Sequence, residues 1–373
     1  MPGVKKDKQA SLQLLWQQTL SDYITSLVWF PDGAASVPPN SLIASSAAGE
    51  VAFYRHHPQT KTPSPDSILL QAATGQSIDC LAISHDGQFI AAGGQNGEVK
   101  IWQMQTGEPI LVATLANAPA WVDQMAWNPK QNLLAFSLGR YVQVWDAEIG
   151  EVAATLNFEN SSVLDITWHP DGDRLTVAGY QGVKVWSTQD WDEDPYFVEI
   201  PSASAIIAWS PEGKYIASGN LDRTISVIEW ENPTIPWVMR GFSGKIRQLV
   251  WTDTAQKRGA PLLASSSSQS IVVWEKDPDE LIGWNGHVLG EHDDRVQAMQ
   301  FQPGTATLAS AGADGWIVIW QKAARIGQMV EGAPAGFSCL AWHPKGRQLA
   351  AGGQSGEVLV WASIVRAQGF GQK

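Results

Sequence analysis

A pattern that recurs eight times constrains this chain more than any other feature. Each copy has an apolar run, a turn, a second run of mostly small residues such as LIASS or LAAGG, and a third, alternating run. Short alternating runs separated by turns predict β-strands, and a period of about 41 to 48 residues is typical of a four-stranded unit. The copies end at Tyr54, Trp102, Trp145, Trp186, Ile228, Trp274, Trp320 and Trp361.

A fourth strand for each unit is predicted between the copies. Seven apolar runs lie there, at residues 68–73, 110–115, 152–158, 197–200, 237–240, 287–290 and 326–330. The eighth run, residues 12–20, precedes the first copy. A unit without its outer strand would expose an open sheet edge, so we expect residues 12–20 to pair with the last unit and close a ring. Ile364–Val365, near the C-terminus, could compete for that place.

Composition favours one domain in this chain of 373 residues, because Gly and Pro recur throughout without a linker. We predict a flexible basic tail at residues 1–11, one domain at 12–365 and a C-terminal tail at 366–373. No apolar run is long enough for a membrane-spanning helix, and the N-terminal residues lack the apolar core of a signal peptide. Twelve of the 19 tryptophans stand at the ends of first or third runs, which assigns them to packing between units.

Net charge and cysteine usage narrow the classes of function. The formal net charge is −12, whereas proteins that bind phosphate backbones usually carry a basic balance. We therefore expect no nucleic-acid partner and no membrane insertion. Cys80 and Cys339 lie in strand patterns without a Cys-x-x-Cys spacing, so neither a disulfide framework nor a zinc site is predicted. A cytoplasmic location is the expectation.

The seventh copy contains four residues that can bond to one another: His292, Ser310, Asp314 and Trp320. With them the chain resembles the WD-repeat family of β-propellers, as a divergent, bacterial-type member. In that family such residues form one buried hydrogen-bond network within a blade. The resemblance therefore implies that these four stabilise a blade and are not a catalytic triad. Only Asp222 and Asp314 keep the acid of the turn between the second and third strands, so most blades lack the full network.

The resemblance implies an all-β fold, an eight-bladed propeller closed by the N-terminal strand. Seven blades plus an irregular N-terminal hairpin is the alternative, because copy one is the most degenerate. Its first turn is long and Tyr54 replaces the final Trp.

Known catalytic motifs are absent from the sequence. There is no P-loop, no Gly-x-Ser-x-Gly elbow and no His-Glu-x-x-His. His56 and His57 are adjacent, and adjacent side chains of an extended segment point to opposite faces, which makes a poor chelate. We interpret these histidines and the acidic run at residues 190–195 as solvated loops, and predict no cofactor and no metal.

The resemblance also implies a binding surface at the central opening, where the inner strand of each blade begins and family members commonly bind peptides. In an eight-bladed ring, copies two and three lie opposite copies six and seven. We expect one acidic side with an exposed Trp and one basic side, which suits a mixed-charge peptide. Solvated rim charges are the alternative. The candidate residues are Tyr23, Asp79, Trp121, Asp123, Lys245, Arg247 and Arg295.

The opposite face carries Trp191, Trp230 and Trp284 beside several acids. They could dock a basic partner, but we interpret them as packing over blade edges. The function predicted is a non-enzymatic scaffold that binds a partner protein or peptide on the propeller faces. Two alternatives stay open: a small-ligand receptor or enzyme with its site in the central channel, and a metal-handling or complex-assembly accessory protein.

Overall fold

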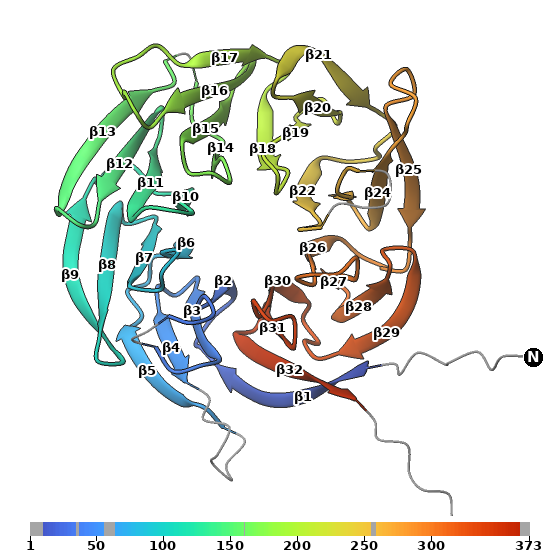
Figure 1. The fold of residues 1–373 in the computed structure, drawn as a ribbon. Helices are drawn as coiled ribbons and strands as arrows, with labels where there is room; N and C mark the ends of the chain where they lie inside the picture. The colour runs from blue at the N-terminus through green and yellow to red at the C-terminus, as the bar shows by residue number, and fades with distance from the viewer. Residues whose placement is uncertain (1–9, 35–36, 56–63, 160, 255–258, 366–373) are drawn as a thin grey trace, which may run out of the picture.

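Eight four-stranded antiparallel sheets stand in a closed ring around a central opening (Figure 1). The computed structural model describes residues 10–34, 37–55, 64–159, 161–254 and 259–365. Every regular element in these ranges is a strand, so they contain no helix that could cross a membrane. The prediction of an all-β, eight-bladed propeller is confirmed, and the seven-blade alternative is wrong because copy one forms a complete blade.

The first four blades follow one another along the chain. Blade 1 contains β2 (Ile24–Trp29), β3 (Ser41–Ser46), β4 (Val51–Arg55) and β5 (Asp66–Gln71). Blade 2 contains β6 (Ile78–Ile83), β7 (Phe89–Gly94), β8 (Glu98–Gln105) and β9 (Glu108–Ala116). Blade 3 contains β10 (Met125–Trp127), β11 (Leu133–Leu138), β12 (Tyr141–Asp146) and β13 (Glu151–Asn157). Blade 4 contains β14 (Asp165–Trp168), β15 (Arg174–Gly179), β16 (Gly182–Ser187) and β17 (Tyr196–Glu199).

The last four blades complete the ring. Blade 5 contains β18 (Ser204–Trp209), β19 (Tyr215–Asn220), β20 (Ile225–Glu229) and β21 (Asn232–Met239). Blade 6 contains β22 (Ile246–Trp251), β23 (Leu263–Ser267), β24 (Ser270–Lys276) and β25 (Trp284–Leu289). Blade 7 contains β26 (Val296–Phe301), β27 (Leu308–Gly312), β28 (Trp316–Gln321) and β29 (Arg325–Glu331). Blade 8 contains β30 (Phe337–Trp342), β31 (Gln348–Gly353), β32 (Glu357–Val365) and, from the other end of the chain, β1 (Ala10–Thr19).

Strand β1 is the outer strand of blade 8 and lies antiparallel to β32 (Figure 1). Ile364 pairs with Ser11, so the C-terminal run lengthens β32 and does not compete with β1. Gln328 of blade 7 bonds both backbone groups of Leu12, at 2.8 and 2.9 Å. β1 begins within the predicted tail 1–11, whose residues 1–9 lie outside the described ranges, as does the predicted tail 366–373.

Tryptophans at the ends of inner strands join neighbouring blades. The indole N–H of Trp29 donates to the Ala341 carbonyl of the preceding blade at 2.9 Å. Trp168 and Trp251 make the equivalent bond to the preceding inner strand at 3.0 and 3.1 Å. A large apolar ring with one satisfied polar atom can fill a seam without leaving a buried donor unpaired. Trp127 and Trp342, at the same position in blades 3 and 8, have no partner for the indole N–H among the described residues, so ring packing is what all these positions share.

A second set of contacts joins inner strands through side-chain oxygens. Gln248 accepts a hydrogen bond from the backbone N–H of Met299 in the next blade at 2.6 Å. Gln300, two positions further along its strand, accepts one from the backbone N–H of Trp342, also at 2.6 Å. Asp165 takes this role between blades 4 and 5, accepting from Ile207 at 2.7 Å. The seam between blades 4 and 5 therefore has a carboxyl group at the position where blade 6 has the neutral amide of Gln248.

Candidate functional site

The four residues singled out in blade 7 are brought together. His292 Nδ1 lies 2.9 Å from an Asp314 carboxylate oxygen, and its Nε2 lies 2.8 Å from Ser310 Oγ. The Trp320 indole N–H donates to the same Ser310 oxygen at 2.9 Å. Asp314 also accepts from the Asp293 backbone N–H at 3.0 Å. A network in which each polar group is paired fixes one arrangement of strands. The geometry of these four residues is therefore that of a hydrogen-bond network that stabilises one blade.

Blade 5 has a different polar network, which the sequence reading missed. Ser218 donates to Asn220 Oδ1 at 2.8 Å, and Asn220 Nδ2 donates to Thr224 and Ser226 at 2.9 and 3.1 Å. Asp222 of the adjacent turn is exposed and only caps that turn, through Thr224. The sequence feature that could have predicted this network is Asn220 at the end of β19, which lies close in sequence to Ser218, Thr224 and Ser226.

The acidic side of the central opening lies on blades 2 and 3. Asp79 accepts a hydrogen bond from Ser77 Oγ at 2.6 Å. Partial burial, and after it the neighbouring charge of Asp79, raise the pKa of Asp123, so the two carboxylates lie within electrostatic reach of each other. Trp121, two residues before Asp123, is 56% exposed. The structure thus brings Trp121, Asp79 and Asp123 into one neighbourhood.

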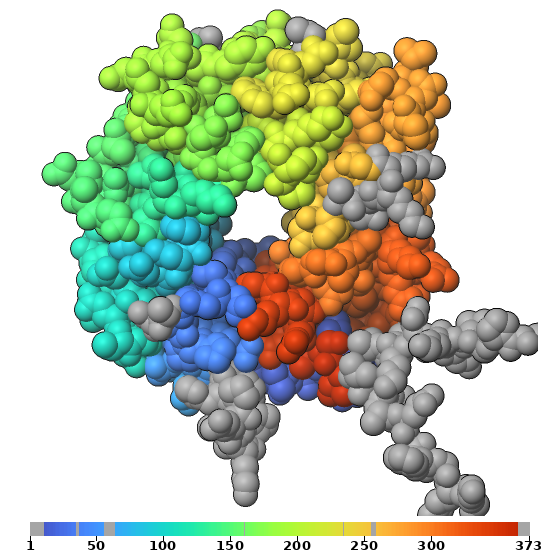
Figure 2. All heavy atoms as spheres, viewed as in Figure 1, coloured from blue at the N-terminus to red at the C-terminus, as the bar shows by residue number. Residues whose placement is uncertain are grey.

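The basic side lies on blades 6 and 7, across the ring from blades 2 and 3 (Figure 1). Lys245 and Arg247 are exposed. Arg295 is also exposed, but its guanidinium lies 3.8 Å from Asp294, which the sequence reading did not weigh. Burial raises the pKa of Tyr23, and the charge of Arg295 opposes that rise. Tyr23 itself directly precedes β2 of blade 1. Figure 2 shows the opening as a hole in the centre of the molecule.

Two exposed aromatic residues lie on the turns between the second and third strands of blades 3 and 4. Tyr141 opens β12 and Tyr180 follows β15, and both side chains are exposed. The Tyr180 backbone N–H donates to Ser161 Oγ at 2.9 Å, which fixes that turn. These turns belong to the same face of the ring as Trp121. These residues could have been found in the sequence as aromatic residues in the turn where the family pattern has Asp.

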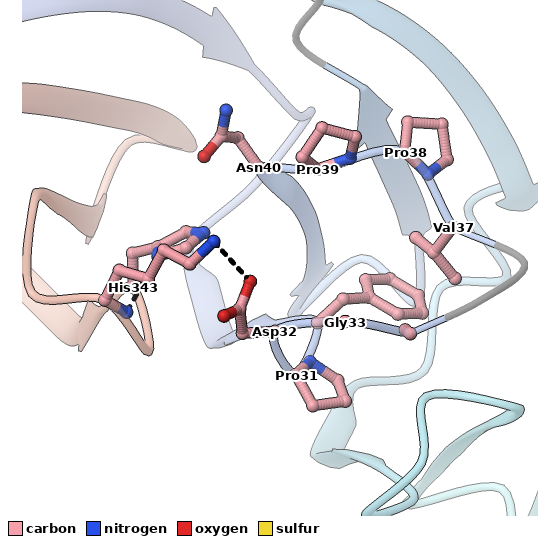
Figure 3. Close-up of a pocket in the computed structure, with 11 residues that line it drawn as sticks. Pro31, Asp32, Gly33, Val37, Pro38, Pro39, Asn40 and His343 are labelled. Carbon is pink, nitrogen blue, oxygen red and sulfur yellow. Dashed lines mark hydrogen bonds and ion pairs between the residues drawn. The ribbon is translucent and has the colours of Figure 1, made fainter.

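The opposite face has a cavity of about 270 Å³ between blades 8 and 1 (Figure 3). Lys345 Nζ lies 2.7 Å from Asp32 Oδ1 at its edge. His343 Nδ1 accepts from the Lys345 backbone N–H at 3.1 Å, which leaves the ring proton on Nε2. Desolvation lowers the pKa of His343, so the ring is neutral at pH 7. The lining residues are Phe30, Pro31, Asp32, Gly33, Ala34, Val37, Pro38, Pro39, Asn40, His343 and Lys345.

This cavity lies where a contact between blades is missing. In the seam between blades 4 and 5, His169 Nε2 meets the Gly213 carbonyl at 3.3 Å. His343 is the equivalent of His169, and Gly33 the equivalent of Gly213. Among the described residues these two make no such bond, and both line the cavity. On this face the last and first blades are joined instead by the Lys345–Asp32 ion pair and by the edge contact of Trp29 with His343, at a centroid distance of 5.1 Å.

Three tryptophans of the opposite face pack over blade edges, as interpreted from the sequence. Trp191 meets the edge of Trp168 at a centroid distance of 6.3 Å. Trp230 lies between Tyr196 and Trp209, each at 5.5 Å. Trp284 is buried. No group of three metal-ligating side chains occurs in the ranges that the structure describes, and His56 and His57 lie outside those ranges.

Comparison with known proteins matches this geometry. The model of the WD domain, G-beta repeat (WD40) matches residues 67–103, 150–187, 204–229, 283–321 and 327–362. Four of the matches begin in the outer strand of one blade and continue through the first three strands of the next. The matched segments fall on blades 2, 4, 5, 7 and 8.

Similar proteins come from a plant and a yeast. Transcriptional corepressor LEUNIG_HOMOLOG of Arabidopsis thaliana is 22% identical, over 82% of this chain and 38% of its own length. WD repeat-containing protein 26 homolog of the same plant is 21% identical, over 84% of this chain and 53% of its own. APC/C activator protein CDC20 of Saccharomyces cerevisiae is 23% identical, over 72% and 37%.

The chain thus spans about half or less of the length of these relatives. All three are eukaryotic, so they give the bacterial-type character expected from the sequence no support. Eight blades in the predicted order, five of them matched by the repeat model, make this chain a member of the WD40-repeat family.

Proposed function

We propose that this propeller is a protein-interaction scaffold, not an enzyme, and that a partner peptide binds at the central opening. The observation that carries the proposal is Trp121, an indole 56% exposed beside the Asp79–Asp123 pair. Large aromatic side chains contribute much of the affinity of protein interfaces when a partner covers them. Relatives described as a corepressor and as an activator fit a scaffold role in general.

Charge would orient the peptide across the opening. A cationic group of the peptide would face Asp79 and Asp123, and an anionic group would face Lys245 and Arg247. These groups lie on opposite sides of the ring, which is unfavourable for a catalytic site because reacting groups must converge on one atom. No arrangement of the described residues gives comparable support to the alternatives of a small-ligand receptor or a metal-handling protein. Free Cys80 and Cys339 support a reducing compartment, and we propose the cytoplasm.

Substitutions at the opening are expected to remove bound partners. Trp121→Ala and the double change Arg247→Glu/Arg295→Glu should each lower partner recovery by about tenfold or more, since interface aromatic and Arg residues often contribute over 1.4 kcal/mol. Recovery would be measured by quantitative mass spectrometry after affinity purification from the native cell.

The matched control for the charge reversal is Lys322→Glu/Arg325→Glu, which reverses two exposed charges where β28 ends and β29 begins. It should leave recovery unchanged. If wild type and the Arg247→Glu/Arg295→Glu variant recover identical sets of partners, the proposal that partners bind at the central opening is contradicted.

A further inference from the structure

The outer rim of blades 5 and 6 exposes a group of apolar side chains that packing within the ring does not use. Leu281 is 96% exposed and Ile235 is 79% exposed. They lie on the β24–β25 loop and on β21, at the outer edge of the ring (Figure 1). We call this group the rim ridge, and it consists of Ile235, Val238, Leu281, Ile282 and Val288.

The loop that presents Leu281 and Ile282 is held in one conformation by its own hydrogen bonds. Asp277 Oδ1 accepts from the Asp279 N–H at 2.8 Å, and Asp279 Oδ1 accepts from the Leu281 N–H at 2.9 Å. The Asp277 N–H donates to the Gly283 carbonyl at 2.7 Å and closes the loop. The fixed backbone therefore holds the Leu281 and Ile282 side chains in solvent, although their burial would be favourable.

Trp237 of β21 joins the loop to the neighbouring blade. Its indole N–H donates to the Glu280 carbonyl at 3.2 Å. A Cβ at position 283 would collide with the Trp237 ring, so Gly283 permits the close approach. Lys276 Nζ lies 4.3 Å from the centre of the same ring. The loop and β21 thus form one continuous surface across two blades.

The loop that carries Leu281 and Ile282 is acidic. It contains Asp277, Asp279 and Glu280, with Lys276 at the end of β24 beside it; on blade 5, exposed Arg240 follows β21. Lys276 is only 8% exposed and lies 2.7 Å from Glu280, so it contributes little positive potential to the surface. Contiguous exposed apolar residues with a charged border mark docking sites, and charge complementarity selects the partner.

We propose that the rim ridge docks a protein partner that offers an apolar groove or helix face bordered by Lys and Arg. The formal net charge of −12 disfavours a second copy of this chain as the partner. This surface lies on the outside of the ring, so the inference is independent of peptide binding at the central opening.

The probe is a synthetic 18-residue amphipathic helix of Leu and Lys, labelled for fluorescence anisotropy with the full chain. Leu281→Ser/Ile282→Ser should weaken its binding by about tenfold or more, because two apolar side chains lose a partner. The control, Leu111→Ser/Ile149→Ser, removes two other exposed apolar residues, from blades 2 and 3, and should bind like wild type. A Leu/Glu version of the peptide should bind about tenfold more weakly or worse.

Equal affinity of the Leu281→Ser/Ile282→Ser variant and the control would overturn the docking site. Equal affinity for the Lys and Glu peptides would overturn the basic partner. Analytical ultracentrifugation adds a third outcome: a wild-type dimer that Leu281→Ser/Ile282→Ser dissociates would mean that a second copy occupies the ridge, which also overturns the proposal.

Discussion

Replacement of Trp320 with alanine is expected to lower the free energy of unfolding by about 3–5 kcal/mol, the usual cost of truncating a buried aromatic side chain. The Trp320 ring is 4% exposed in the core between blades 6 and 7. Its loss would also remove the N–H donor of the Ser310 oxygen in the blade 7 network. The measurement is urea unfolding followed by circular dichroism.

Trp230→Ala is the matched control for Trp320→Ala. Trp230 directly follows β20, and its ring, partly exposed, packs on Tyr196 and Trp209 without an indole hydrogen bond among the described residues. When the Trp230 ring is removed, the rings of Tyr196 and Trp209 can move into part of the space that it leaves. A smaller cavity means a smaller loss of unfolding free energy. We expect a clearly smaller loss than for Trp320→Ala. Equal losses would show that the blade 7 network adds nothing to tryptophan packing.

Asp165→Asn is expected to stabilise the protein at pH 8 by about 3 kcal/mol and to have little effect near pH 4. Burial raises the pKa of Asp165 to about 7, although the backbone N–H groups of Ile207 and Ile166 favour the ionised form. The pKa in the unfolded chain is about 3.9. The amide oxygen of Gln248 already accepts the equivalent bond between blades 6 and 7. An asparagine oxygen can therefore keep the bond from Ile207, whereas the bond from Ile166 to the other carboxyl oxygen is lost.

The sign follows from proton binding. Because the pKa of Asp165 is raised in the folded state, the folded protein keeps a proton that the unfolded chain releases. The stabilising contribution is present below about pH 4 and is lost as pH rises through about 7. Unfolding free energies at intervals from pH 4 to pH 8 test this, with exposed Asp192→Asn as the control. A constant difference between Asp165→Asn and wild type over that range would contradict the pKa.

The number and order of strands could be predicted because each unit repeats the same local pattern. The outer strands at 110–115 and 326–330, for example, fall within β9 and β29. Exact ends could not be predicted, since they depend on partner strands: β1 begins at Ala10 because β32 extends to Val365. A sequence period contains no information on such pairing between the two ends of the chain.

The candidate site could be predicted only at the level of its residue types. Counting back from the end of each inner strand identified Trp121 and Asp123, because that spacing is fixed by the repeat. It did not identify the neighbours that modify them, such as Asp294 beside Arg295. The Asp165 contact with Ile207 spans two blades, and the raised pKa of Asp165 arises from burial; no local sequence pattern contains either.

Pairing of the first and last strands is the central claim, and an engineered disulfide tests it most directly. Gln13 of β1 and Ala362 of β32 are paired across the two strands, and a disulfide requires Cα atoms within about 7 Å. With Cys80 and Cys339 replaced by alanine, Gln13→Cys/Ala362→Cys should cross-link within one chain on mild oxidation, as read by peptide mass mapping. Gln17→Cys/Ala362→Cys, which is out of register because Gln17 pairs with Leu359, should not. Failure of the paired variant to cross-link, or equal cross-linking of both variants, would contradict closure of the ring by the N-terminal strand.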